Sequence, residues 1–437
     1  MKRHFQILLW ASLCCSGVST SAPASQGLLE KPPNVKVINL LHNAAGSTDT
    51  TSREIVRNEK GVFDLPGLGI RVRTDFDGAR ANAVTRVGEK SIEVFIDSEN
   101  KPINWSPWYS FTIEQAGPQR PDHLSIRLTY PQRENSARSP HRYRPKLSSD
   151  GGATWKEIEN SEYNHEEGVF KVNLDTLPLA VSAQELMTSK DSLEWIETLS
   201  EKNFISYEVI GKSIGGRPLH MVHIVEGTED DKEELFILSR QHPPEVTGYL
   251  AMRHFVEYLA SEKPDAKAFR KKLNIRVAPM VNPDGVDDGH WRHNYGGIDL
   301  NRDWLEADGQ IEAKFNQPET RQVSKAFLRF KERKVAFALD FHSTYRDVFY
   351  HDAAIGTNEY NLILNWIYRI GAKLPNSKLD IQGSAKSYST TSKSWMRRQF
   401  GCPAVTYEVD DKTDREELES VAVEAAKSLI VELLERN

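Results

Sequence analysis

Cysteine is scarce in this 437-residue sequence. There are three cysteines, and two of them, Cys14 and Cys15, lie close to the N-terminus. Only Cys402 remains in the rest of the chain, so a disulfide framework is excluded there. Stability must therefore come from burial of apolar side chains, which a chain of this length can achieve.

A hydrophobic run long enough to cross a membrane is also missing. The apolar run FQILLWASLCC is too short to span a bilayer. Basic residues precede it and the small residues SGVSTSAPA follow it, which is the order of a secretion signal. We predict a signal peptide at residues 1–24 that ends at Ala24. The product would be a secreted protein, and with a single remaining cysteine a bacterial periplasm fits best. The alternative, lipid attachment at Cys14 or Cys15, is disfavoured because neither has a leucine three positions before it.

The sequence has no surplus of basic residues. It contains 56 Lys and Arg against 62 Asp and Glu, a formal net charge of −6. This balance argues against a nucleic-acid binder or a protein that binds anionic membranes. Internal repeats and low-complexity blocks are absent too. The apolar fraction of 39% and the charged fraction of 27% are those of a soluble globular protein, whose length favours two domains.

The first part of the chain has the pattern of an all-β domain. Between residue 61 and about 175, short segments alternate apolar and polar residues, as in SIEVFID (91–97) and HLSIRLTY (123–130). Alternation with a period of two is typical of half-buried strands, and Pro and Gly separate the segments. We predict an N-terminal β-sandwich domain over residues 25–180, in which residues 25–60 form a loosely held lead-in.

From about residue 185, apolar strand-like runs alternate with segments of helical periodicity. The runs are ELFILS (234–239), NIRVAPMV (274–281), VAFALDFH (335–342) and PAVTYEV (403–409). Continuously apolar strands that alternate with helices predict α/β layering. We therefore predict a second domain over residues 185–437, built on a mixed, largely parallel sheet flanked by helices.

Candidate metal ligands stand at the ends of these strands. His242 follows ELFILS, and Glu245 opens the helix behind it, with Pro243 and Pro244 fixing the step between them. A catalytic zinc needs three protein ligands and an open position, and two histidines with one glutamate are a standard set. His342, at the end of VAFALDFH, can supply the third ligand. Open α/β sheets place their sites at these strand ends, although a single histidine is more often structural.

Further motifs make the combination specific. The segment VNPDGVDDGHWRHNYGGIDLNRDW (281–304) by itself could be a polar loop. The series H-x-x-E, NPDG, W-R, DLNRDW, DFHS and TYEV, however, resembles the zinc metallocarboxypeptidase family typified by carboxypeptidase A. The stretch IGKSIGGRPLHMVHI (210–224) is similar to that family's first strands. The resemblance runs from about residue 190 to residue 437.

The resemblance implies a zinc carboxypeptidase catalytic domain over 185–437, with one Zn²⁺ per chain. His242, Glu245 and His342 correspond to the family's zinc ligands, and Glu408 in TYEV corresponds to its general base and acid. The implied reaction is hydrolysis of the C-terminal peptide bond of a peptide or protein by zinc-activated water. Without the other motifs, Glu408 would be taken for an exposed charge at a strand end.

The resemblance also implies substrate-binding residues. Arg292 corresponds to the arginine that polarises the scissile carbonyl, and Asn301 and Arg302 correspond to the pair that holds the terminal carboxylate. Tyr388 is the candidate for the mobile tyrosine that covers the substrate, although its spacing to the next tryptophan is shorter than in the family. Lys393 stands where the family places its specificity determinant and would favour a C-terminal Asp or Glu. The alternative is a solvated lysine.

The first domain carries a resemblance of its own. FDGARANAVTR (76–86), WYSFTI (108–113) and YRPKLSSDGGATWKEI (143–158) resemble the β-sandwich before the catalytic domain in the cytosolic-carboxypeptidase-like subgroup. That group includes tubulin deglutamylases, but a secretion signal departs from it, so tubulin is not implied as the substrate. A bacterial member acting on periplasmic peptides fits better.

Two alternative functions stay open. A zinc amidase or deacylase, for example one acting on murein peptides, could share the metal ligands. The octapeptide SSDGGATW (148–155) fits the aspartate box of sialidase propellers, which raises a glycan-binding module. A propeller repeats this box in each blade, whereas the chain has one copy, so a tight hairpin turn is the simpler interpretation.

Overall fold

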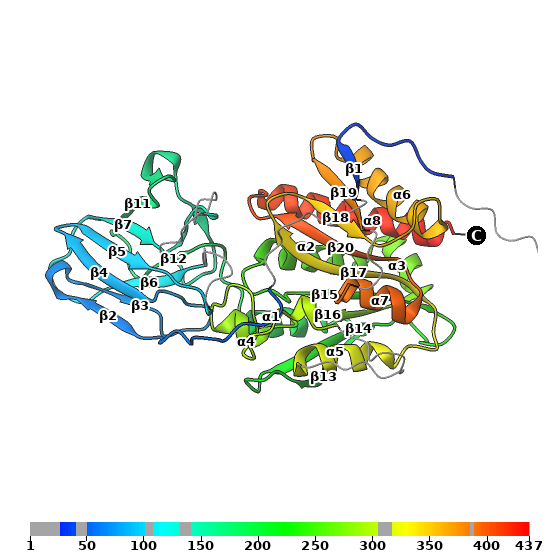
Figure 1. The fold of residues 1–437 in the computed structure, drawn as a ribbon, viewed down its shortest axis with the longest axis horizontal. Helices are drawn as coiled ribbons and strands as arrows, with labels where there is room; N and C mark the ends of the chain where they lie inside the picture. The colour runs from blue at the N-terminus through cyan, green and yellow to red at the C-terminus, as the bar shows by residue number, and fades with distance from the viewer. Residues whose placement is uncertain are drawn as a thin grey trace, which may run out of the picture.

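A computed structural model describes residues 27–40, 50–100, 108–131, 141–304, 317–384 and 389–436. The predicted signal peptide (1–24) and Tyr388 lie outside these residues. Figure 1 shows an all-β lobe beside a larger lobe in which helices cover a central sheet. The two lobes correspond to the two parts of the sequence, the one with the strand pattern and the one in which strands alternate with helices.

The all-β lobe contains two sheets that share one core. The six-stranded sheet has the order β2 (Val62–Leu65), β3 (Ile70–Arg73), β6 (Ser110–Gln115), β12 (Leu179–Ser182), β8 (Lys146–Ser148) and β9 (Lys156–Glu157). The five-stranded sheet has the order β10 (Tyr163–Asn164), β11 (Val169–Asn173), β7 (His123–Thr129), β5 (Ser91–Phe95) and β4 (Ala83–Gly88). The 3₁₀ turns η1 (Pro66–Leu68) and η2 (Asn160–Glu162) connect strands. Alternate residues such as Ile92 and Val94 of β5 meet Val72 of β3 in the core, as the period of two predicts.

The larger lobe is built on a nine-stranded sheet. Its order is β1 (Val35–Leu40), β19 (Leu379–Ser384), β18 (Val348–His351), β20 (Ala404–Asp410), β17 (Val335–Thr344), β15 (Glu233–Ser239), β16 (Leu273–Ala278), β14 (Pro218–Ile224) and β13 (Ile205–Lys212). The neighbouring pairs β1–β19, β19–β18, β20–β17, β17–β15 and β15–β16 are parallel. The other three pairs are antiparallel. The predicted mixed, largely parallel sheet is confirmed.

Helices bury both faces of this sheet. One core includes side chains of α1 (Ser189–Leu199), α2 (Val246–Leu259), α3 (Pro264–Arg270), α6 (Asn358–Lys373) and α8 (Arg415–Leu434). The opposite core includes side chains of α5 (Pro318–Leu328) and α7 (Ser392–Phe400). Within β15, Leu235 and Ile237 enter the first core, while Phe236 and Leu238 enter the second. A strand buried on both faces explains why ELFILS is apolar at nearly every position.

The predicted start of the sandwich at residue 25 is wrong. Residues 35–40 form β1, which pairs in parallel with β19 at the edge of the nine-stranded sheet (Figure 1). The side chain of Asn34 donates to the carbonyls of Gly371, Leu374 and Ser377, 2.8–3.1 Å away, at the end of α6. The N-terminal segment therefore covers a sheet edge of the second lobe, an assignment that the local pattern of an edge strand cannot reveal.

The segment SSDGGATW forms a hairpin turn between β8 and β9. Asp150 accepts hydrogen bonds from the Thr154 hydroxyl (2.6 Å), the Thr154 amide (3.0 Å) and the Ser148 hydroxyl (2.8 Å), which lower its pKa to about 2. Gly151 and Gly152 take φ angles of 75° and 92°, where a side chain would be strained. The hairpin interpretation is confirmed, and the carboxylate of Asp150 accepts hydrogen bonds from other residues of the same turn.

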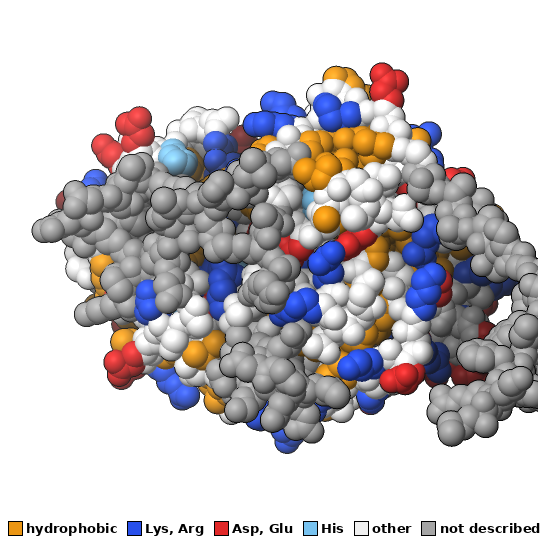
Figure 2. Space-filling model, turned by 45° about the vertical axis from the view of Figure 1, so that its right-hand side comes forward, with side chains coloured by type: hydrophobic (Ala, Val, Ile, Leu, Met, Phe, Trp, Pro, Cys, Tyr) orange, Lys and Arg blue, Asp and Glu red, His pale blue; other side chains and the backbone are white. Residues whose placement is uncertain are grey.

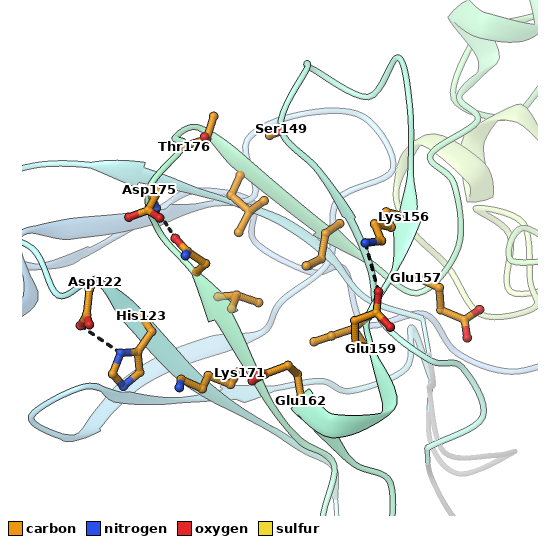
Figure 3. Close-up of a pocket in the computed structure, with 15 residues that line it drawn as sticks. Asp122, His123, Ser149, Lys156, Glu157, Glu159, Glu162, Lys171, Asp175 and Thr176 are labelled. Carbon is orange, nitrogen blue, oxygen red and sulfur yellow. Dashed lines mark hydrogen bonds and ion pairs between the residues drawn. The ribbon is translucent and has the colours of Figure 1, made fainter.

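A cavity of about 810 Å³ opens beside this hairpin, at the edge of the sandwich (Figure 3). Two pairs of its lining residues contact each other, Lys156 with Glu159 and Asp122 with His123 (Figure 3). Its lining includes no Trp, Tyr or Phe on which a sugar ring could stack. The cavity therefore adds no support to a glycan-binding function.

The surface has mixed charge where it can be seen. In the view of Figure 2, Lys and Arg side chains are interspersed with Asp and Glu. In the described part of the chain, no helix combines the length and the apolar character needed to cross a membrane.

Candidate active site

His242, Glu245 and His342 converge where β15, α2 and β17 meet. All three side chains are buried, and one ligand atom from each lies within 4.8 Å of the others. Nδ1 of His242 is 2.8 Å from Oε1 of Glu245 and 3.2 Å from Nδ1 of His342. Nδ1 of His342 is 2.7 Å from Oε2 of Glu245. Two imidazole nitrogens and one carboxylate are a donor set that fits a catalytic zinc.

A buried carboxylate holds the far ring nitrogen of each histidine. Asp299 accepts from Nε2 of His242 at 2.9 Å, and Asp340 accepts from Nε2 of His342 at 2.8 Å. These bonds assign the ring proton to Nε2 and leave the lone pair of each Nδ1 directed at the ligand cluster. The geometry around both histidines is therefore that of metal ligands rather than of core histidines.

Asp299 and Asp340 were not among the predicted site residues. Both lie inside motifs that the sequence offered, DLNRDW and DFHS, but no spacing rule links them to the histidines. Burial opposes ionisation of Asp299, yet the charge of Arg292 and the hydrogen bond from Nε2 of His242 hold its pKa well below the usual value. An ionised carboxylate at this position favours a His242 ring that donates through Nε2.

The loop between β15 and α2 is tightly determined. Arg240, just before the ligands, has a φ of 57°, and its Nε donates to the carbonyl of Pro243 at 2.9 Å. Glu245 is the N-cap residue of α2, as predicted. An added Cβ on Gly248 would lie 2.2 Å from the carbonyl oxygen of His342. The first turn of α2 can therefore touch β17 only with glycine there, which brings Glu245 to His342.

The NPDG motif supports this loop from behind. Asn282 caps α4 (Pro283–Asp287) by accepting from the Gly285 amide at 3.0 Å, and its Nδ2 donates to the carbonyl of Gln241 at 3.1 Å. Asp284 is buried and pairs with Arg217 at 2.9 Å. The motif therefore fixes the backbone next to His242, and its residues are not among the three candidate metal ligands.

Glu408 lies on the strand next to His342. In the parallel pair β17–β20 the two residues are direct register partners. Glu408 is partly buried. Burial and the negative charge of Glu245 raise its pKa. A carboxyl group next to the three candidate metal ligands is placed to take up and return a proton.

Arg292 faces the same region. Its Nε donates to Oδ2 of Asp299 at 2.7 Å, and its side chain is 22% exposed. Burial acts against its charge, but Asp299 and Glu245 raise the pKa of Arg292 above the usual value. Asp299 therefore links Arg292 to His242 through one carboxylate.

Asn301 and Arg302 lie on the 3₁₀ turn η3 (Leu300–Arg302). The backbone N–H of Asn301 donates to Oδ1 of Asp299 at 3.0 Å, and the side-chain oxygen of Asn301 accepts the backbone N–H of Ser392 at 3.0 Å. Nη1 of Arg302 donates to the carbonyl of Asn301 at 2.8 Å. The structure thus brings both predicted clamp residues to the loop that holds His242.

Lys393 is buried and pairs with Asp352 at 2.5 Å. The alternative of a solvated lysine is therefore wrong. The sequence did not suggest Asp352, 41 residues earlier, as its partner. Asp352 offsets the charge of Lys393, which bears on the predicted preference for acidic residues.

The lead-in also reaches the site, so its description as loosely held is wrong for residues 50–53. The hydroxyl of Thr50 donates to Oδ2 of Asp299 at 2.5 Å. Ser52 forms an antiparallel bridge with Ile298, and the Arg53 amide donates to the carbonyl of Gly297 at 2.8 Å. A polar segment without periodicity gave no signal for these contacts.

Comparison with known proteins places the second lobe in a family. The model of the family described as zinc carboxypeptidase matches residues 192–428, more than half of the chain. Mouse cytosolic carboxypeptidase 6 is 35% identical over 120 residues, which are 26% of this chain and 22% of that protein. An uncharacterized protein of Zymomonas mobilis is 24% identical over 283 residues, 63% of this chain and 68% of that one.

Solved structures show the same fold. A metallo-carboxypeptidase from Burkholderia cenocepacia superposes with a TM-score of 0.69 at 16% identity, covering 83% of this chain and 98% of that chain. A Pseudomonas aeruginosa metallo-carboxypeptidase gives 0.66 at 20% identity and covers 83% and 99%. The chain spans 22% of the length of mouse cytosolic carboxypeptidase 6 and 12% of that of human cytosolic carboxypeptidase 4.

Proposed function

Because the chain belongs to the zinc carboxypeptidase family and is a metallocarboxypeptidase, we propose that it uses one zinc ion to remove a single residue from a peptide C-terminus. The observation that carries this proposal is the buried cluster of His242, Glu245 and His342 beside Glu408. A zinc ion bound there would lower the pKa of a bound water toward ~7.

The remaining steps fall to the side chains around the cluster. The carboxylate of Glu408 accepts the proton of the attacking water and delivers it to the leaving amine nitrogen. The guanidinium of Arg292, held through Nε by Asp299, donates to the oxygen of the scissile carbonyl as negative charge develops there. Pre-orientation by Asp299 lowers the cost of placing this donor.

Asn301 and Arg302 determine which peptide bond of the substrate is cleaved. An amide N–H and a guanidinium can both donate to the free carboxylate at a peptide C-terminus. The clamp requires that carboxylate, so an exopeptidase follows. An amidase or deacylase acting on murein peptides through the same metal ligands would not need the clamp.

A digest of a peptide library with the zinc-loaded enzyme tests this function. Mass spectrometry should show loss of one C-terminal residue, and the same peptides with an amidated C-terminus should remain intact. Arg302→Met should lose this preference for a free carboxylate. Internal cleavage, or equal cleavage of amidated peptides, would contradict the proposal and favour the amidase alternative.

We propose that the residue released is preferentially Asp or Glu, as the position of Lys393 in the family pattern implies. The pairing of Lys393 with Asp352 opposes this preference, because the ammonium is already neutralised. Rates on three peptides that differ only in a terminal Glu, Phe or Lys decide the matter. Fastest release of Glu supports the proposal, and equal rates would show that Asp352 cancels the charge.

We also propose export to a bacterial periplasm, on the basis of the sequence pattern in residues 1–24. Expression of the full chain in a Gram-negative bacterium, followed by N-terminal sequencing of the periplasmic protein, tests this. The expected mature N-terminus is Ser25. A cytoplasmic product that retains the first 24 residues would contradict it.

A further inference from the structure

A buried acid of the sandwich domain contacts the segment that carries Arg292. Glu99 lies just beyond β5 and is 1% exposed. Its Oε1 accepts the backbone N–H of Arg292 at 2.8 Å and that of His293 at 2.9 Å. Its Oε2 accepts the backbone N–H of Trp291 at 2.6 Å. One carboxylate thus satisfies three consecutive backbone donors of the other domain.

The sandwich satisfies the carbonyls just before this segment as well. Nη1 of Arg80, a residue that is 1% exposed, donates to the carbonyl of Gly289 at 3.1 Å. Lys60 donates to the carbonyl of Asp287 at 2.5 Å, and the Gly78 amide donates to the same oxygen at 2.6 Å. Buried backbone groups need partners, and here the sandwich supplies them.

The charge of Glu99 is locally compensated. Burial opposes its ionisation, but the contact with His293 and the positive charge of Arg80 hold the pKa of Glu99 well below its usual value. A carboxylate that accepts several N–H bonds is a stronger anchor than a neutral amide would be.

We propose that Glu99 is a positioning residue for Arg292, so that the sandwich domain is part of the catalytic apparatus. Arg292 is then held twice: Glu99 fixes its backbone, and Asp299 fixes its guanidinium. The inference rests on the proposed role of Arg292. Glu99 would act only through Arg292 and would touch neither the substrate nor the metal ligands.

The substitution Glu99→Gln tests this, because it keeps the shape but turns one acceptor into a donor that faces the Trp291 amide. Glu114→Gln is the matched control, since Glu114 is a carboxylate of the same domain that pairs with Arg73 in a partly exposed position. Glu99→Asp, which keeps the charge at a shorter reach, is the second variant should the first fail to fold.

Two measurements are made on each variant. Hydrogen exchange of the amides of residues 291–293 should become faster in Glu99→Gln and stay unchanged in Glu114→Gln. With a peptide substrate, kcat should fall by about 10-fold to 100-fold, the scale of a misplaced catalytic group, while KM changes much less. Glu99→Asp should move both readouts in the same direction by a smaller amount.

A double-mutant cycle separates positioning from general stability. If Glu99 acts through Arg292, adding Glu99→Gln to Arg292→Ala should cost no further activity. Additive losses, or unchanged exchange at residues 291–293, would overturn the inference while the proposed function stands. Full activity of Arg292→Ala would instead refute the role given to Arg292, and with it the catalytic consequence of Glu99.

Discussion

Replacing Asp299 by Asn should weaken zinc binding and catalysis together. The carboxylate of Asp299 accepts from Nε2 of His242, from Nε of Arg292, and from the hydroxyl of Thr50 and the amide of Asn301. An asparagine keeps one acceptor oxygen and turns the other into a donor. Either His242 or Arg292 must then face an N–H group, and the charge that supports both is lost in either orientation.

The size of the effect follows from these contacts. Removing the carboxylate partner of a metal-bound histidine typically lowers metal affinity about 10- to 100-fold, or roughly 1.4–2.8 kcal/mol. The loss should be in this range because Asp299 is fully buried and no water can replace it cheaply. Turnover at saturating zinc should fall as well, since Arg292 loses its anchor.

The assay is competition for zinc between the protein and a chelating dye at constant pH. Asp303→Asn is the control, because Asp303 is equally buried on the same loop but accepts from Gln317 and Thr320 rather than from a metal ligand. Zinc affinity should be unchanged in Asp303→Asn. Equal affinity of wild type and Asp299→Asn, or equal losses in both variants, would refute the reasoning.

Three further predictions concern the scaffold. Glu185, in the pairs with Arg415 and Lys146, has a pKa of about 2, because these cations outweigh the cost of burial. Because the pKa of Glu185 is lower in the folded state, its ionised side chain stabilises the fold fully at pH values above the unfolded pKa near 4.5. This stabilisation is lost as the pH falls toward 2. At pH 7, Glu185→Gln should therefore unfold at a lower urea concentration than wild type, with a free energy of unfolding lower by up to about 3 kcal/mol. The two proteins should become equally stable near pH 2, and a difference that does not change with pH would contradict this. Burial raises the pKa of Cys402 to about 12, so a thiol reagent at pH 8 should modify it in denaturant and not in the native protein lacking residues 1–24. Changing Pro243 and Pro244 to Gly should reduce zinc affinity by loosening the step from His242 to Glu245; unchanged affinity would make the prolines incidental.

The sequence predicted what depends on periodicity and on complete motifs. ELFILS and VAFALDFH are apolar throughout because their strands are buried on both faces, so the ends that carry His242 and His342 could be located. Glu408 was assigned through the family resemblance of TYEV, and in the structure it is the register partner of His342 on the neighbouring strand.

The parts that could not be predicted arise from contacts between distant segments. β1 adds to an edge of the second sheet, and an edge strand carries no mark of the sheet it will join. The partners of the site residues are also remote in sequence: Thr50 reaches Asp299, Glu99 reaches the backbone of Arg292, and Asp352 pairs with Lys393. Each of these partners is a polar residue, and nothing in the local sequence pattern distinguishes a buried polar residue from a solvated one.

Glu408→Gln gives the most direct test of the proposed mechanism. The substitution keeps the size of the side chain and removes the group that is to accept and return the proton, while His242, Glu245 and His342 are untouched. Zinc content and turnover of a peptide with a free C-terminus should be measured on the same sample. We expect one zinc per chain with turnover reduced at least about 100-fold, the scale of general acid–base catalysis. A variant that binds zinc and retains wild-type turnover would contradict it.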